Sequence, residues 1–214
     1  MKRKILIASG NPHKREKLTW IVKDYFDIIQ FPEDVNINVK AEENGQTFIQ
    51  NAEIKAREYS KHYKGFVIST DGGVIIPVLG ENWNPLKTKR FCGEDTTDSE
   101  RINLLLDLMK DKTGEERKMV WKEAIALAKE GKILFSTQAD GIEGLLEKSF
   151  DEKKYKPGIW VCSVWFFPQF NKNFFDLNTN EKKRTEISWE KLKESTHNFL
   201  NSPIMESNFS MVFS

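Results

Sequence analysis

Residues 4–20 read KILIASGNPHKREKLTW and decide the fold class. The apolar run at 4–8 is typical of a short buried strand. Asn11 is a favoured N-cap and Pro12 suits the first position of a helix, so the pattern predicts a helix over about residues 12–26. A strand that leads through a glycine turn into a helix is a unit of α/β folds.

Strands and helices alternate along the rest of the chain. The patterns predict one helix that begins at the capping sequence of Thr47, a second over residues 98–110 and a third over residues 188–200. Strands are expected at 65–70, 132–138 and 158–167. The pattern of residues 119–128 fits either a helix or one arm of a hairpin. This alternation predicts one α/β domain over residues 1–214.

Composition excludes several classes of protein. The 33 basic and 32 acidic residues leave a formal net charge of +1, whereas a nucleic-acid-binding protein usually gathers a basic excess on one face. No apolar run approaches the ~20 residues that span a bilayer. Cys92 and Cys162 are expected to be free thiols in a reducing compartment. The sequence therefore predicts a cytoplasmic protein that binds neither nucleic acid nor membrane.

The turn from Ser9 to Lys14 is the first candidate site. A tight glycine turn at a helix N-terminus directs unpaired backbone N–H groups outward and favours an anion. His13, Lys14 and Arg15 oppose the helix dipole by ~0.3–1 kcal/mol each, and an anionic ligand would offset that cost. An ordinary loop with solvated basic residues accounts for the same pattern equally well.

The second candidate is the acidic loop 42–45 and the helix that follows it. Asn51 and Lys55 are four residues apart and share one helix face. A carboxylate such as Glu43 suits Mg²⁺, which takes few protein oxygens and shares phosphate oxygens. A solvated acidic loop is the alternative.

The third candidate is Asp71, expected at the end of the strand 65–70 and followed by Gly72 and Gly73. Ligands in open α/β sheets lie beyond the carboxyl ends of the strands, and glycine lets a phosphate approach the backbone. An aspartate there can deprotonate a metal-activated water. A turn-forming Asp-Gly pair is the alternative.

Taken in order, four segments make the pattern specific: SGNPHK at 9–14, EENGQTFIQNA at 42–52 with Lys55, DGG at 71–73 and RFCGED at 90–95. They resemble the inosine triphosphate pyrophosphatase family, whose members cleave non-canonical purine nucleoside triphosphates to monophosphate and pyrophosphate. The resemblance is close to about residue 110 and holds only in outline beyond. It implies a mixed, twisted sheet flanked by helices, two lobes around a central cleft, and a homodimer.

The resemblance also implies roles for individual residues. Lys14 would bind phosphate, with Ser9 and Asn11 forming the turn, and Lys55 would contact the triphosphate. Glu43 would help to hold Mg²⁺, and Asp71 would act as general base beside the same metal. The further substrate contacts predicted are Asn51, Gly72, Gly73, Arg90 and Arg184.

Three departures from the family pattern concern metal and base. Thr70 stands where the family has the first of two carboxylates, so metal binding is weakened or the hydroxyl acts through a water. Residues 159–163 replace the aromatic segment that shapes the base pocket. Trp189 and Glu190 replace the histidine and arginine that contact the purine. The pattern thus indicates a retained phosphate half and a rebuilt base half.

Together these features predict Mg²⁺-dependent hydrolysis of a nucleoside triphosphate with altered base specificity. A related hydrolase acting on a different nucleotide is one alternative. The other is a nucleotide-binding protein with little or no turnover, which the loss of a carboxylate at Thr70 favours.

Overall fold

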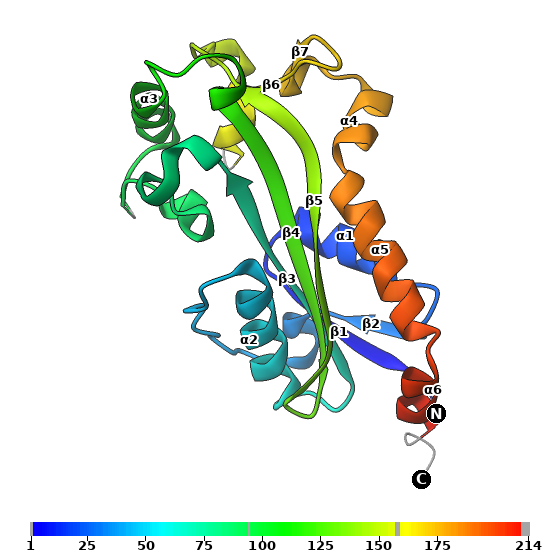
Figure 1. Ribbon diagram of the computed structural model, residues 1–214. Coiled ribbons are helices and arrows are strands. Elements are labelled where there is room, and N and C mark those ends of the chain that lie inside the picture. The colour runs from blue at the N-terminus through cyan, green and yellow to red at the C-terminus, as the bar shows by residue number, and fades with distance from the viewer. Residues whose placement is uncertain (1, 94, 157–158, 211–214) are drawn as a thin grey trace. The chain divides into compact units, whose positions relative to one another are not determined.

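The computed structural model describes residues 2–93, 95–156 and 159–210, without the side chains of Lys89, Arg90 and Ser210. Its strands are β1 Lys4–Ala8, β2 Ile28–Gln30, β3 Phe66–Ile75, β4 Lys118–Lys129, β5 Lys132–Leu146, β6 Trp165–Phe167 and β7 Lys172–Asn173 (Figure 1). Its α-helices are α1 Pro12–Val22, α2 Phe48–Ser60, α3 Asp98–Leu108, α4 Thr179–Thr185, α5 Ile187–Leu200 and α6 Pro203–Ser210.

The strands form one seven-stranded mixed sheet in the order β2-β1-β3-β4-β5-β6-β7. Strand β1 pairs in parallel with β2 and with β3, and Ile5 lies opposite Phe66 in the second pair. Strands β5, β6 and β7 pair in antiparallel fashion. The expected α/β class with a mixed sheet flanked by helices is confirmed.

The chain divides into two compact units. The first contains residues up to Gly72, Glu123–Ala139 and the residues from Ser188 onward, and the second contains Gly73–Lys122 and Asp140–Ile187. Each unit has a hydrophobic core of its own.

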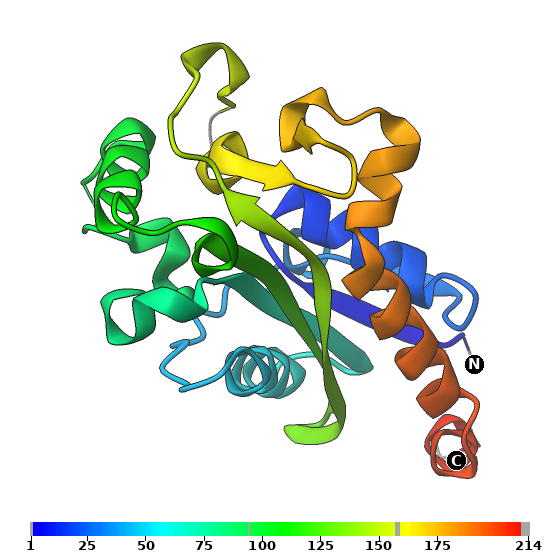
Figure 2. The same ribbon diagram turned by 45° about the horizontal axis from the view of Figure 1, so that its top comes forward.

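Alternation along the strands builds the first unit. Ile5 and Ile7 of β1 face a core shared with helices α1, α5 and α6. Leu6 and Ala8 face the other side, where they pack with Tyr63, which follows α2. Figures 1 and 2 show α1 and α5 on one side of these strands and α2 on the opposite side. Both faces of β1 are thus covered, as is typical of parallel strands.

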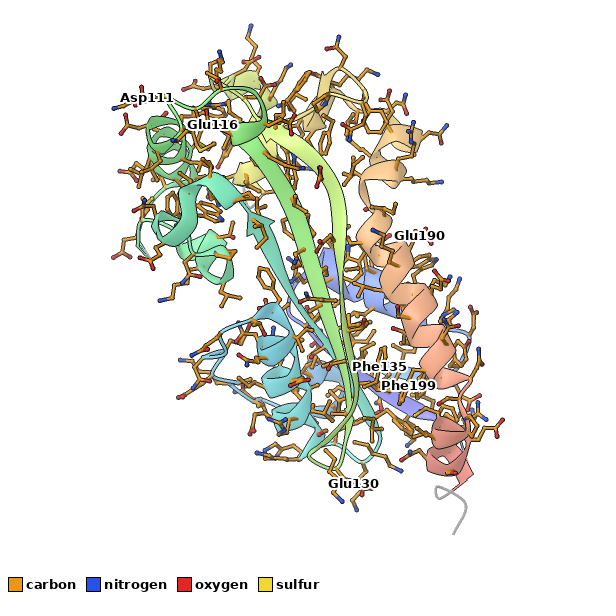
Figure 3. All side chains as sticks on the ribbon, viewed as in Figure 1. Asp111, Glu116, Glu130, Phe135, Glu190 and Phe199 are labelled. Atoms are coloured by element: carbon orange, nitrogen blue, oxygen red, sulfur yellow. The ribbon has the colours of Figure 1, made fainter. Side chains whose placement is uncertain are left out.

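Aromatic contacts attach the long helix α5 to the sheet. The rings of Phe135 on β5 and Phe199 on α5 stack with centroids 4.7 Å apart at an interplanar angle of 12° (Figure 3). Trp189, one of the departures noted in the sequence, is also buried in this core. The packing explains why α5 begins near the predicted position and runs its full length to Leu200.

The ambiguous segment 119–128 lies in β4, so the hairpin interpretation is correct. Glu130 and Gly131 join β4 to β5 with φ values of 51° and 76°, and Figure 3 shows Glu130 at the tip. Two consecutive left-handed residues match the right-handed twist of a hairpin. The alanines of the segment pack in the sheet, where tertiary burial overrides helix propensity.

Two predicted boundaries are wrong. Strand β3 does not end at a turn before Asp71 but continues to Ile75, because Gly72 and Gly73 are not among the glycines with positive φ and the following residues pack in the second core. The stretch 160–167 is largely buried, whereas Ile159 is exposed, and the stretch is not one strand. Trp160–Val164 form a 3-10 helix, η6, and only β6 is extended, while Gly158 lies outside the described residues.

Arg117 organises the second unit from within. Its side chain is 4% exposed, and its guanidinium donates hydrogen bonds to the carbonyl oxygens of Met109, Lys112, Leu146 and Glu147. Two of these carbonyls follow α3, and the other two belong to the last residue of β5 and the residue after it, so one side chain satisfies acceptors from two distant segments.

Replacing Arg117 by Met should lower the free energy of unfolding by about 3 kcal/mol, because four carbonyl oxygens lose the charged donor that they share. Denaturant titration followed by tryptophan fluorescence measures the change. Lys110→Met is the control, since that side chain is 65% exposed and surface substitutions usually stay within ~0.5 kcal/mol. Equal stability of the two variants would contradict this role for Arg117.

Candidate functional site

The turn between β1 and α1 forms as the sequence predicts. The Asn11 side chain caps the helix by accepting a hydrogen bond from the backbone N–H of Lys14, at 3.2 Å. The Ser9 hydroxyl in turn accepts from the N–H of Asn11, at 3.3 Å. Local capping chemistry therefore places Ser9, Asn11 and Lys14 around one helix N-terminus.

Arg15 is committed to protein partners. Its guanidinium makes a two-pronged ion pair with Glu33, with N–O distances of 2.5 and 2.9 Å, and its Nε lies 2.5 Å from the carbonyl oxygen of Ser9. Arg15 also lies over the ring of Phe31. A cavity of about 460 Å³ adjoins these groups and is lined in part by Ser9, Gly10 and Tyr59. The simple alternative of solvated basic residues is therefore wrong for Arg15.

Lys14 has a carboxylate partner that lies far away in the sequence. Its Nζ is 3.1 Å from Oε1 of Glu123 on β4, and the two side chains are 18% and 1% exposed. The Thr70 hydroxyl lies 2.5 Å from the same carboxylate oxygen and 2.7 Å from the carbonyl oxygen of Ala124. Position 70 lacks a carboxylate, but Glu123 brings one within hydrogen-bonding distance of it.

Nothing in the sequence singled out Glu123 apart from its place directly before the apolar run 124–128. A charged residue next to a buried apolar run is a signal of a functional or paired group. The pairing of Glu123 with Lys14 could not be predicted from the sequence, because it depends on the position of β4 in the folded sheet.

A second group of polar side chains gathers around α2. The Nζ of Lys55 is 3.1 Å from Oε2 of Glu43 and donates to the carbonyl oxygen of Thr70 at 3.2 Å. Asn51, one turn earlier, donates from Nδ2 to Oδ2 of Asp71 at 3.0 Å. The shared helix face predicted for Asn51 and Lys55 is thus present, and both side chains reach β3.

The acidic loop is held against α2 by the same amide. Oδ1 of Asn51 accepts a hydrogen bond from the N–H of Gly45 at 2.8 Å. A Cβ at position 45 would lie 2.7 Å from Cβ of Gln50 and 2.8 Å from Oδ1 of Asn51. Only glycine allows this close approach, which fixes the loop that carries Glu43.

Asp71 lies at the centre of these charges. Burial raises its pKa above the ordinary 3.8, while Lys14, Lys55 and the Asn51 amide lower it and Glu43 raises it. Desolvation is the largest of these effects. A carboxylate whose pKa is raised by burial beside two lysines has the character expected of a general base.

The remaining predicted residues divide between the two units. Gly72 is the last residue of β3 in the first unit, and Gly73 begins the second. Arg184 on α4 also belongs to the second unit, with its guanidinium 4.7 Å from the ring centroid of Phe170. Arg90 ends the 3-10 helix η3, Pro85–Arg90, and its side chain lies outside the described part. The structure therefore brings together Ser9, Asn11, Lys14, Glu43, Asn51, Lys55 and Asp71 in the first unit.

The residues aligned with the family's purine-contacting motif do not form a polar surface that could hydrogen-bond a base. Ser188 and Trp189 are 1% and 5% exposed. Trp189 packs in the first core, with its ring edge-on to His13. Glu190 is exposed on α5 (Figure 3).

Among the described residues, no group of three or more histidine, cysteine, aspartate or glutamate side chains is arranged to hold a metal ion. Mg²⁺ commonly uses only one or two carboxylates and completes its shell with water and substrate phosphates. Glu43 and Asp71 are donors of that kind, and the charge of Glu43 is one of the influences that raise the pKa of Asp71. The donor set therefore fits a magnesium ion that arrives with a phosphate ligand. In the same described ranges, no helix has the length and apolar character to cross a bilayer.

Comparison with known proteins agrees with this fold. The model of the Ham1 family matches residues 5–188. A dITP/XTP pyrophosphatase from Thermoanaerobacter sp. (strain X514) is 32% identical over 183 residues, covering 85% of this chain and 88% of that protein. One from Campylobacter jejuni subsp. jejuni is 33% identical over 186 residues, covering 84% and 88%.

Solved structures share the fold. A HAM1 protein from Coxiella burnetii superimposes with a TM-score of 0.76 at 23% identity, covering 92% of this chain and 99% of that one. A nucleoside-triphosphatase / dITP/XTP pyrophosphatase from Mycobacterium abscessus gives a TM-score of 0.70 at 26% identity, covering 88% and 96%. The resemblance seen in the sequence is confirmed, and the chain belongs to the Ham1 family.

Proposed function

We propose that this protein hydrolyses a nucleoside triphosphate to the monophosphate and pyrophosphate with the help of Mg²⁺. Its curated relatives are named dITP/XTP pyrophosphatases, which are hydrolases, and the chain is an enzyme of that class. The observation that carries the proposal is the gathering of Lys14, Lys55 and Asp71, the last with a raised pKa, next to a helix N-terminus.

Each side chain has a role that its surroundings support. Lys14 and Lys55 would neutralise charge that develops on the phosphates. Asp71 would accept a proton from the attacking water, because burial makes it a better base than an ordinary aspartate. Glu43 and Asp71 would hold Mg²⁺, which supplies Lewis-acid stabilisation of the phosphate oxygens when bound. Ser9, Asn11 and Gly72 would line the path of the phosphates.

Base specificity is proposed to differ from that of an enzyme dedicated to inosine or xanthosine. A site gains large discrimination when buried polar groups hydrogen-bond a particular substrate group, and loses it when those groups are absent. Here Trp189 is buried in the core and Glu190 is exposed and acidic. Neither offers the donors that a histidine and an arginine would provide.

A panel of nucleoside triphosphates tests both proposals. Pyrophosphate release should require Mg²⁺ and disappear with a chelator, and kcat/KM for inosine and xanthosine triphosphates should lie within about tenfold of that for guanosine triphosphate. Coupled pyrophosphate detection and nucleotide chromatography give the products. A preference above 100-fold for inosine triphosphate would show that other residues read the base.

Absence of turnover with every nucleotide, together with measurable binding, would favour the nucleotide-binding alternative. That alternative drew support from the missing carboxylate at Thr70, and the neighbouring Glu123 weakens it. A homodimer, a cytoplasmic location and the absence of nucleic-acid partners remain predictions from the sequence, as do the substrate contacts of Gly73, Arg90 and Arg184.

A further inference from the structure

We propose that Glu123 is the positioning residue for Lys14, and that it supplies from β4 the carboxylate that position 70 lacks. The inference rests on the proposed function, because it assigns to Lys14 a phosphate of the substrate. It concerns three side chains, Lys14, Thr70 and Glu123, which meet at a single carboxylate oxygen.

The fold directs all three side chains to one place. Ile125 and Leu127 of β4 pack in the core shared with α1, so Glu123, two residues earlier, lies on the same face of the strand. Thr70 bears the same relation to Phe66 and Ile68 on β3, which face that core as well. Lys14 enters from the first turn of α1. Two strands and one helix thus converge on Oε1 of Glu123.

Stability alone does not account for this arrangement. A buried ion pair usually gains little over well-packed apolar residues of similar volume. A lysine in the first turn of a helix is also disfavoured by the helix dipole. Glu123 is 1% exposed and Lys14 is 18% exposed, so the anion is fully enclosed while part of the cation remains open. The Glu123 carboxylate thus holds the partly exposed ammonium group of Lys14 at a helix N-terminus that favours anions.

The contact between Thr70 and Glu123 makes positions 70 and 123 alternatives. The Thr70 oxygen lies 2.5 Å from the carboxylate of Glu123, so an aspartate at 70 would place its own carboxylate within reach of the space that Oε1 occupies. Two carboxylates at this distance repel each other strongly. The arrangement therefore accommodates one carboxylate, which can come from position 70 on β3 or from position 123 on β4.

Glu123→Gln separates positioning from simple charge. If Glu123 were only a nearby anion, its removal would strengthen binding of inorganic tripolyphosphate by Coulomb's law. If Glu123 positions Lys14, the same substitution should weaken metal-free tripolyphosphate binding, measured by calorimetry, and pyrophosphate release, each by about tenfold. Unchanged or tighter tripolyphosphate binding would overturn the proposal.

The double variant Thr70→Asp/Glu123→Gln moves the carboxylate to the neighbouring strand. It should recover tripolyphosphate binding to within about threefold of the wild type, while Thr70→Asp alone should lower the melting temperature and recover nothing. This arm remains decisive if Glu123→Gln alone fails to fold. Failure of a folded double variant to recover binding would count against the proposal.

Glu33→Gln is the matched control. Glu33 also pairs with a basic residue of the first turn, Arg15, but is 58% exposed, and the contacts described for it include none with Lys14. Its removal should leave tripolyphosphate binding unchanged or slightly tighter. Wild-type protein that binds tripolyphosphate but turns over no nucleotide would refute the proposed function alone, because the binding measurements would still test Glu123. Wild-type protein that does not bind tripolyphosphate would refute both.

Discussion

Asp71→Asn is expected to lower kcat for pyrophosphate release by about 10²–10⁴-fold, the usual effect of removing a general base. Asparagine has the same shape and can still accept the hydrogen bond that Asn51 donates to Asp71. Nucleotide binding should therefore survive. Steady-state kinetics and calorimetry with a non-hydrolysable triphosphate analogue measure the two effects separately.

The same variant should be at least as stable as the wild type at neutral pH. The pKa of Asp71 is raised above 3.8 by burial, so the stability that this group contributes is fully present below pH 3.8 and is lost as the pH rises through the raised value. Asparagine carries no charge to desolvate. In metal-free denaturation curves, the free energy of unfolding of the variant should accordingly increase relative to that of the wild type as the pH rises through this window.

Asp107→Asn is the control, because that aspartate is 65% exposed and pairs only with Lys110 among the described contacts. It should change neither kcat nor the pH dependence of stability. A parallel loss of stability and activity in Asp71→Asn would instead make Asp71 a structural residue.

Lys14→Ala should raise the Kd for a nucleoside triphosphate by about 10²-fold, because truncating one member of a shielded charge contact commonly costs 2–5 kcal/mol. Lys14 is also the ion-pair partner of the enclosed Glu123. An unfolding free energy lower by about 3 kcal/mol is therefore also expected.

Binding and stability can be separated with a second substitution. Adding Glu123→Gln to Lys14→Ala removes the unpaired buried charge, so stability should return while triphosphate affinity stays low. Lys23→Ala, an exposed lysine at the other end of α1, should alter neither property. Normal nucleotide affinity in Lys14→Ala would show that the turn is only a structural connection.

The features predicted correctly from the sequence are those encoded locally. The cap at Asn11, the turn after β1 and the shared face of Asn51 and Lys55 depend on residues within a few positions of one another. Such patterns carry their own physical cause, so they survive without knowledge of the fold.

The features that were missed depend on distant neighbours. Glu123 acquires its significance from Thr70, 53 residues away, and from Lys14, which no local pattern connects to it. The turn predicted after residue 70 failed for a related reason. Gly-Gly permits many backbone conformations, and the packing of Val74 and Ile76 in the second core selects the extended one.

The amide of Asn51 connects two events that are otherwise separate. Its oxygen accepts from the N–H of Gly45 and its nitrogen donates to Asp71. Both hydrogen bonds therefore depend on the orientation of one side chain. Deuterium can replace the Gly45 amide hydrogen only when this bond opens, and a rotation of the side chain that opens it also takes the donor away from Asp71. Loosening of the acidic loop and a change in the proton affinity of Asp71 are thus thermodynamically linked, and each must influence the other.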